Sequence, residues 1–145
     1  MAPTRVSINK KSRDQKGATT LEFAIVSILF ILLVFGIIDF GLLFYNQQVI
    51  TNAAREGARY GIVARPEDYK ITEGAVETRV QSFALSHLVY HGTGDFVSDA
   101  SFKSGLPYCG KFKDELNVHV TYAYSFFFLP FDLPLLESWT TMICE

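Results

Sequence analysis

Only a few side chains in this sequence have types and spacings that could do chemistry. Cys109 and Cys144 could form one disulfide in an oxidising compartment, and they are otherwise buried or free thiols. His87 and His91 are four residues apart, a spacing that can place two metal ligands on one side of a helix. Cations at a helix C-terminus explain both histidines equally well, so we predict no metal site.

Motifs of catalysis are missing from the sequence. It contains no glycine-rich phosphate loop, no Gly-x-Ser-x-Gly nucleophile elbow and no His-Glu-x-x-His zinc helix. We therefore expect a protein that is not an enzyme and that needs no cofactor.

Two carboxylates stand out because they interrupt an apolar segment. Residues 21–45 contain only two charged side chains, Glu22 and Asp39. At 1.5 Å per residue this segment is long enough to cross a hydrocarbon core of roughly 30 Å, which predicts a membrane-spanning helix. The two acids would lie about 26 Å apart along its axis, near opposite interfaces. There Asp39 would either contact a basic residue of another subunit or be solvated among the outer headgroups.

The charges before this segment predict its orientation. Residues 1–17 carry a net charge of +4, and the remaining residues carry −6. The positive-inside rule then places the N-terminus in the cytoplasm and everything after Tyr45 on the exported side of the membrane. An exported part that acidic argues against a nucleic-acid partner. The basic side chains are Arg5, Lys10, Lys11, Arg13 and Lys16.

The residues just before the apolar segment suggest why an acid stands near its start. A carboxylate at the edge of a bilayer helix costs up to a few kcal/mol unless it has a partner. If the chain were cut between Gly17 and Ala18, the new α-amino group would lie one helical turn from Glu22. It could then offset that charge within the chain or in a neighbouring subunit. The alternative is that the Glu22 side chain extends to the cytoplasmic interface.

The sequence around this junction resembles a known family. A basic leader ending in Lys-Gly, followed by Ala-Thr-Thr-Leu-Glu-Phe, resembles the class III signal of prepilins and pseudopilins. The continuation from Gly36 looks like the TadE-type minor pilins, or pseudopilins, of the tight-adherence (Flp) pilus system. The resemblance is strong over residues 16–63 and covers only the general pattern of the remainder. Its most specific later parts are Asp39-Phe40-Gly41 and the run from Asn52 to Arg59.

The resemblance implies how the chain is processed and where it makes contacts. An aspartic prepilin peptidase would cleave after Gly17, so that Ala18 becomes the mature N-terminus and Glu22 its fifth residue. Glu22, Phe23 and Asp39 would contact partners during assembly. The implied product is a minor pilin or pseudopilin that assembles, primes or caps a Tad/Flp-type pilus used in adhesion.

The resemblance also implies partners and a location. The partners would be other TadE- or TadF-like minor pilins, the Flp major pilin, the prepilin peptidase and the inner-membrane assembly platform. The chain would cross the bacterial inner membrane once, with a cytoplasmic N-terminus and a periplasmic or extracellular head, and would enter a pilus. The alternative is a permanently membrane-anchored, exported binding module that does not polymerise. An N-terminus at Met1 would favour that anchor, whereas Ala18 would favour pilin processing.

The rest of the chain predicts an α+β, pilin-like head. Helical spacing continues to Val63, and the small residues around Gly57 and Gly61 would pack either on other helices or on the chain's own domain. Arg65-Pro66 should end this helix. A second, amphipathic helix is expected within residues 71–90, followed by a small antiparallel sheet from residues 96–102, 116–124 and 139–144.

These patterns divide the chain into four parts. We expect a basic prepilin leader at 1–17, a transmembrane helix at 18–45, an exported helix continuation at 46–64 and an α+β exported head at 65–145.

Two features of the head remain open at this stage. A disulfide between the two cysteines would stabilise the head by about 3 to 4 kcal/mol. The aromatic run that includes Phe126, Phe127, Phe128 and Phe131 either fills the core or forms an exposed patch. Such a patch would contact the outer leaflet or a partner pseudopilin.

Overall fold

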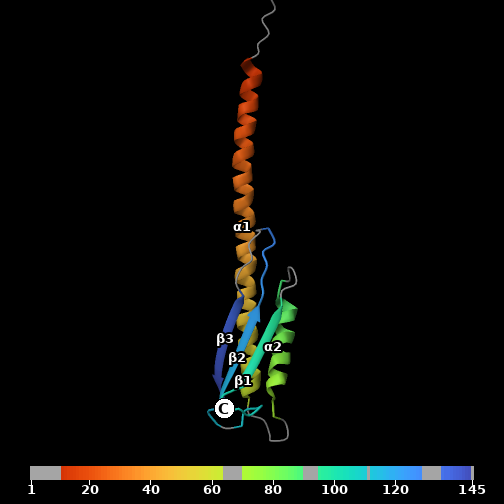
Figure 1. The fold of residues 1–145 in the computed structure, drawn as a ribbon, viewed down its shortest axis with the longest axis vertical. Coiled ribbons are helices and arrows are strands. Elements are labelled where there is room, and N and C mark those ends of the chain that lie inside the picture. Colours follow the sequence, from red (N-terminus) through yellow and green to blue (C-terminus); the bar gives the residue numbers. More distant parts are fainter. Residues whose placement is uncertain (1–10, 64–69, 90–94, 111, 129–134, 145) are drawn as a thin grey trace, which may run out of the picture. The chain divides into compact units, whose positions relative to one another are not determined.

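The computed structural model describes residues 11–63, 70–89, 95–110, 112–128 and 135–144 (Figure 1). The chain divides into two compact units, Met1–Ile37 and Ile38–Glu145. The elements are α1 (Lys11–Ile62), α2 (Glu73–His87), β1 (Phe96–Phe102), β2 (Glu115–Tyr122) and β3 (Leu136–Ile143). A long apolar helix, a second helix and a three-stranded antiparallel sheet confirm the predicted α+β class.

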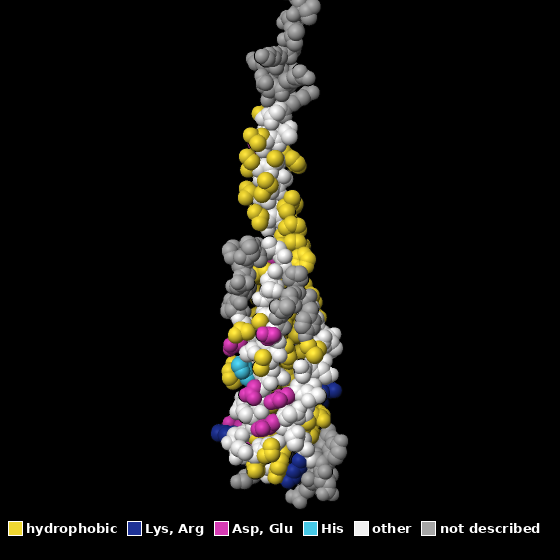
Figure 2. Space-filling model, turned by 45° about the vertical axis from the view of Figure 1, so that its right-hand side comes forward, with side chains coloured by type: hydrophobic (Ala, Val, Ile, Leu, Met, Phe, Trp, Pro, Cys, Tyr) yellow, Lys and Arg dark blue, Asp and Glu magenta, His cyan; other side chains and the backbone are white. Residues whose placement is uncertain are grey.

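The first unit is the N-terminal part of α1. Nearly every side chain from Gly17 to Ile37 is exposed, including Phe23, which is 74% exposed. Figure 2 shows apolar side chains along the visible face of this helix. In the part of the chain that the structure describes, this is the one helix long and apolar enough to cross a membrane. A helix that is apolar on all sides but lacks protein around it is suited to a lipid environment.

The second unit is built around β2. The sheet order is β1-β2-β3, and both pairs are antiparallel, with Phe96 opposite Tyr122 and Glu115 opposite Ile143. Alternate β2 side chains point into the core, as the sequence alternation predicts; they are Leu116, Val118, Val120 and Tyr122. Figure 1 shows the strands beside the C-terminal part of α1 and beside α2.

The stripe of small residues on α1 packs within its own domain. A Cβ added to Gly57 would overlap a γ-methyl of Val80, and one added to Gly61 would lie 2.8 Å from a γ-methyl of Val76. Ala53, Ala54 and Ala58 on the same helix are fully buried. Of the two roles predicted for this face, packing on the chain's own domain is the one realised.

The helix α2 is capped at its start and covers the free edge of the sheet. The Thr72 hydroxyl accepts a hydrogen bond from the Ala75 N–H at 3.4 Å. Glu73 accepts from the Phe102 N–H at 3.1 Å, and Glu77 accepts from the Ala100 N–H at 3.3 Å. Edge strands with unpaired N–H groups invite pairing with other chains, so these glutamates protect β1.

Element ends differ from the sequence-based expectations by a few residues. The last strand begins at Leu136 instead of Trp139, because β3 pairs along β2 from Tyr122 to Glu115. The middle strand ends at Tyr122, where the chain turns toward α1. The described part of α1 ends at Ile62, and the predicted stop at Arg65-Pro66 lies outside the described residues.

Candidate functional site

The predicted cleavage junction lies on the exposed N-terminal part of α1. Gly17 and Ala18 are both exposed, and a Cβ added to Gly17 would meet nothing within 4 Å. Packing among the described residues therefore gives no reason for a glycine at this position.

The acid one turn later is also exposed. Glu22 makes no hydrogen bond or ion pair with any described residue, and the ring of Phe23 beside it is exposed. The structure thus leaves the Glu22 carboxylate available to a group from another molecule.

The side chain of Asp39 is fully buried within its own domain and is not solvated as one of its two predicted roles requires. One carboxylate oxygen, Oδ1, accepts a hydrogen bond from the Phe127 N–H at 3.2 Å, and Oδ2 accepts from the Phe128 N–H at 2.9 Å. A buried carboxylate is stable only when hydrogen bonds or charges compensate it, and here two backbone amides do so. Solvation among headgroups does not describe this buried residue, and its predicted contact with another subunit stays a prediction.

Aromatic side chains complete the contact between α1 and the segment that follows β2. The Tyr124 hydroxyl donates to the Asp39 backbone carbonyl at 3.3 Å. Burial, with smaller contributions from the charge of Asp39 and from Tyr122, raises the pKa of Tyr124 above its usual 10.0. The phenol is protonated at neutral pH, as an ordinary tyrosine is, and the raised pKa extends its role as a donor to more alkaline pH. The ring of Phe126 lies edge-on to both Tyr124 and Phe40, with centroids 5.7 Å away in each case.

The aromatic run is divided between core and surface. Phe126 is partly buried against the core, whereas Phe127 is 53% exposed and Phe128 is 42% exposed. Phe131 lies outside the described residues. Each of the two predicted alternatives is thus realised for a different part of the run.

Asn46 is a positioning residue that the sequence analysis missed. Its side chain is fully buried; its Nδ2 donates to the Val89 carbonyl at 3.1 Å, and its Oδ1 accepts from the Val89 N–H at 3.0 Å. This reciprocal pair holds the chain just beyond α2 against α1. The spacing offered a signal, because Asp39, Asn46 and Ala53 are seven residues apart and so share one face of the helix.

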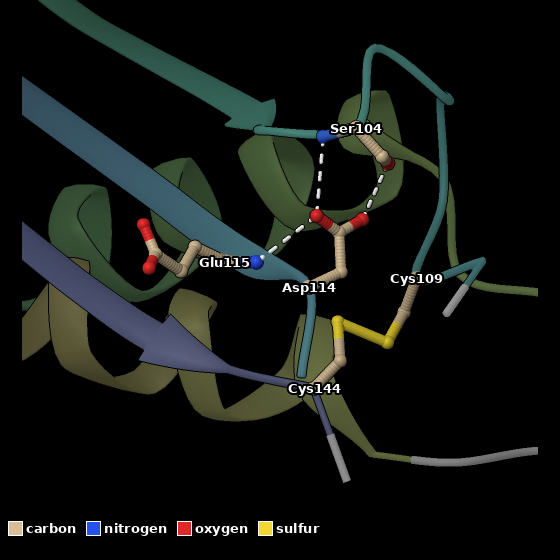
Figure 3. The surroundings of a disulfide bond; sticks show 5 residues. All are labelled: Ser104, Cys109, Asp114, Glu115 and Cys144. Atoms are coloured by element: carbon tan, nitrogen blue, oxygen red, sulfur yellow. Dashed lines mark hydrogen bonds between the residues drawn. A yellow bond between two sulfur atoms is a disulfide. The ribbon is translucent and has the colours of Figure 1, made fainter. Parts of the chain in front are cut away.

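The opposite end of β2 holds the disulfide (Figure 3). Cys109 and Cys144 are bonded, with Cα atoms 6.1 Å apart. Beside them the Asp114 carboxylate accepts from the N–H groups of Ser104 and Glu115 at 3.1 and 3.0 Å, and from the Ser104 hydroxyl. The Asp114 carbonyl accepts from the Cys144 N–H at 2.7 Å. The bond therefore ties the connection between β1 and β2 to the residue that follows β3.

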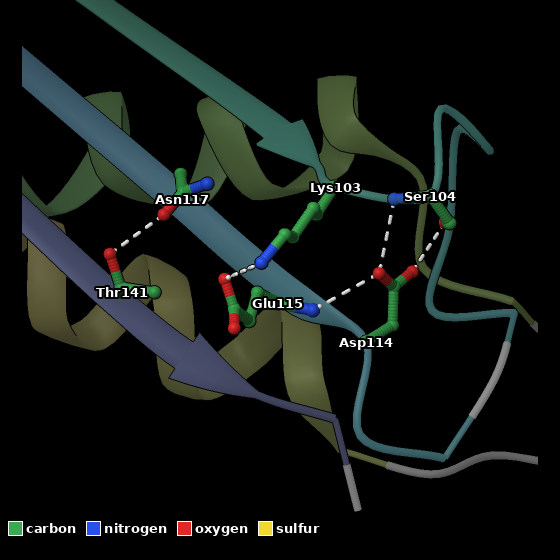
Figure 4. Close-up of polar contacts among 6 residues, drawn as sticks. All are labelled: Lys103, Ser104, Asp114, Glu115, Asn117 and Thr141. Atoms are coloured by element: carbon green, nitrogen blue, oxygen red, sulfur yellow. Dashed lines mark hydrogen bonds and ion pairs between the residues drawn. The ribbon is translucent and has the colours of Figure 1, made fainter.

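Two polar pairs tie neighbouring strands together near that end (Figure 4). Lys103 and Glu115 form an ion pair with a Nζ–Oε2 distance of 3.0 Å. The Thr141 hydroxyl contacts Asn117 Oδ1 at 2.7 Å. Exposed pairs of this kind contribute little stability each, and both are compatible with the register of the sheet.

The histidine of α2 has local partners. His87 Nδ1 lies 2.8 Å from the Phe83 carbonyl and 2.8 Å from the Ser86 hydroxyl, and its ring stacks on Phe83. Among the described residues, no three His, Cys, Asp or Glu side chains are grouped so that they could hold a metal ion. His91 lies outside the described residues.

These features define a class of protein, in which one helix capable of crossing a membrane carries an α+β domain. Residues 17–59 match the family model described as TadE-like protein, which confirms the resemblance found in the sequence. This family is structural rather than enzymatic and is associated with Tad pili. No curated protein and no solved structure matches the chain. The family match ends within α1, so the head is understood from its own structure.

Proposed function

We propose that this chain is a minor pilin, or pseudopilin, that helps to assemble, prime or cap a Tad pilus after a prepilin peptidase cleaves it between Gly17 and Ala18. The observation that carries the proposal is the exposed Glu22 carboxylate. It has no partner among the described residues, it lies one turn after Ala18, and it belongs to the segment that matches TadE-like proteins.

The physical basis is the cost of an unpaired acid in lipid. Cleavage would create a positively charged α-amino group at Ala18, and the same group on a neighbouring subunit can pair with Glu22. Contacts of this kind in a bilayer are favourable by about 1 to 3 kcal/mol each. The pairing would draw the stored subunit out of the membrane and into a filament, where the exposed ring of Phe23 adds apolar contact area.

The proposal includes a location and a set of partners. The segment 18–45 would hold the subunit in the bacterial inner membrane, with the basic leader in the cytoplasm and the head exported. The partners would be other TadE- or TadF-like minor pilins, the Flp major pilin, the prepilin peptidase and the assembly platform.

The first test concerns processing. Mass spectrometry of the membrane-extracted chain should find Ala18 as the N-terminus. Gly17→Leu should keep the leader, because a narrow peptidase site that fits a residue without a side chain would exclude leucine. Gly36→Leu is the matched control and should mature normally, since Gly36 also has nothing within 4 Å of an added Cβ. Maturation of Gly17→Leu at Ala18 would contradict this part of the proposal.

The second test concerns assembly. Glu22→Ala should leave cleavage and membrane insertion intact, and it should reduce both surface pili and the recovery of other pilins by pull-down. Glu22→Asp keeps the charge, so it should retain part of the surface pili and part of the pilin recovery. Normal assembly and normal partner recovery in Glu22→Ala would favour a permanently anchored binding module, which has no use for a subunit-selecting acid.

A further inference from the structure

The segment after β2 presents exposed aromatic rings next to the apolar part of α1. Phe127 and Phe128 are 53% and 42% exposed, and Phe126 beside them packs against Phe40. Phe40 itself is 49% exposed. The exposed rings therefore continue the apolar surface of the helix onto the head, within the unit that begins at Ile38.

Two backbone N–H groups of the segment after β2 already have a hydrogen-bond acceptor, so they could enter lipid without losing a bond to water. The N–H groups of Phe127 and Phe128 both donate to the buried Asp39 carboxylate. An N–H group that enters lipid without a partner costs several kcal/mol, whereas these two already have one. A surface that docks on another protein does not need this, because a partner protein can supply acceptors or leave water in place.

The attachment of the segment after β2 to Asp39 also favours contact with lipid. Asp39 lies within the apolar stretch 21–45, close to its C-terminal end. A loop bonded to Asp39 is thus held where the helix would leave the hydrocarbon and enter the outer headgroups. Large apolar rings are stable at this boundary.

We infer that Phe127 and Phe128 insert into the outer leaflet of the bilayer that holds α1, and that Asp39 positions their backbone for it. The anchor would keep the head at the membrane surface until the subunit leaves the lipid. The inference rests on the membrane placement included in the proposed function, and it does not depend on cleavage or on filament assembly.

Fluorescence quenching in vesicles tests this insertion. The full chain would be placed in phosphatidylcholine vesicles that contain brominated lipids, in a Trp139→Phe background that removes the single tryptophan. Phe128→Trp should show blue-shifted emission that bromine near the headgroups quenches. The matched control is Phe112→Trp, because Phe112 is 77% exposed and lies before the opposite end of β2. That control should remain unquenched.

Two further variants separate the possible outcomes. Phe30→Trp, in the middle of the apolar stretch, should be quenched by deeply placed bromine. If Phe30→Trp is quenched while Phe128→Trp behaves like Phe112→Trp, the anchor is refuted and the membrane placement stands. If neither Phe30→Trp nor Phe128→Trp is quenched, both the anchor and the membrane placement are refuted. A blue shift of Phe128→Trp that needs a second pilin in the vesicle and is not accompanied by bromine quenching would also refute the inference, since it would reveal a protein-docking surface.

The positioning role of Asp39 has its own readout. Adding Asp39→Ala to Phe128→Trp should lower the quenching toward the control value, with the far-UV circular dichroism of the head unchanged. Undiminished quenching in that double variant would show that Asp39 does not position the rings.

Discussion

Glu22 and Asp39 are acids on the same apolar helix, and the structure treats them in opposite ways. Glu22 is exposed and makes no hydrogen bond or ion pair with the described residues. Asp39 is fully buried, and its two carboxylate oxygens accept from two backbone amides of its own chain. The presence of an acid in an apolar stretch therefore does not by itself predict whether its side chain is exposed or buried. Asp39 has hydrogen-bond donors inside its own domain, whereas Glu22 is exposed and has no partner among the described residues.

The difference follows from what surrounds each acid. In the first unit, Glu22 lies on exposed helix surface, and no described residue compensates its charge. The second unit brings the segment after β2 against α1, where the Phe127 and Phe128 N–H groups donate to Asp39. Substitutions in the first unit should therefore change assembly, and substitutions in the second should change the free energy of unfolding.

The largest expected effect on unfolding sharpens that division. Replacing both Cys109 and Cys144 with serine should lower the free energy of unfolding by about 3 to 4 kcal/mol, because the bond closes a long loop in the unfolded chain. Thermal unfolding of the detergent-solubilised chain, followed by Trp139 fluorescence, measures this. Processing at Gly17 should be unaffected. Non-reducing peptide mapping of the natural chain should recover the two cysteines linked, and free thiols there would contradict the prediction.

The next largest change in the free energy of unfolding is expected for Asp39, and Glu22 provides the comparison. Asp39→Ala should destabilise the head by about 2 to 3 kcal/mol, because it removes a charged acceptor from two amides. Glu22→Ala should change the same quantity by less than about 0.5 kcal/mol. Parallel thermal unfolding of the two variants decides the matter. An equal loss of unfolding free energy in the two variants would contradict the conclusion that only Asp39 stabilises the head.

Two glycines of α1 allow a similar comparison with a smaller effect. Gly57→Ala should lower the free energy of unfolding by about 1 kcal/mol, because the added methyl overlaps the stiff Val80 side chain. Gly41→Ala should be neutral or slightly stabilising, since nothing lies within 4 Å of its added Cβ and alanine favours the helix. Chemical denaturation of both variants provides the measurement. A loss of stability in Gly41→Ala equal to that in Gly57→Ala would exclude close packing as the cause.

The smallest effect concerns pH. Because burial raises the pKa of Tyr124 in the folded chain, the folded state holds this proton where the unfolded state releases it. The stabilisation from the Tyr124 proton is fully present below pH 10. The free energy of unfolding should fall as the pH rises beyond that value. Denaturation midpoints at neutral and alkaline pH, compared with those of Tyr124→Phe, give the test. An equally steep fall in Tyr124→Phe would assign the effect to other groups.

Local patterns were sufficient to predict much of the fold. The β2 alternation, with Leu116, Val118 and Tyr122 on one face, is a property of consecutive residues, and the structure buries these side chains as expected. The start of β3 was not predictable in this way. Its first residue, Leu136, is set by pairing with Tyr122 on β2, and the sequence of β3 alone does not contain that register.

The sequence by itself determined the long apolar helix and the α+β class, because composition and periodicity act over neighbouring residues. It also contained the segment that resembles TadE-like proteins, which the family match confirms. Only the tertiary structure decided what Asp39 binds, since its acceptor atoms meet amides 88 and 89 residues further along the chain. It also decided that Gly57 packs on α2 and that Phe126 turns inward while Phe127 and Phe128 remain exposed. Such contacts depend on which distant segments come together, and the free energy of burial that selects them has no signature in local spacing.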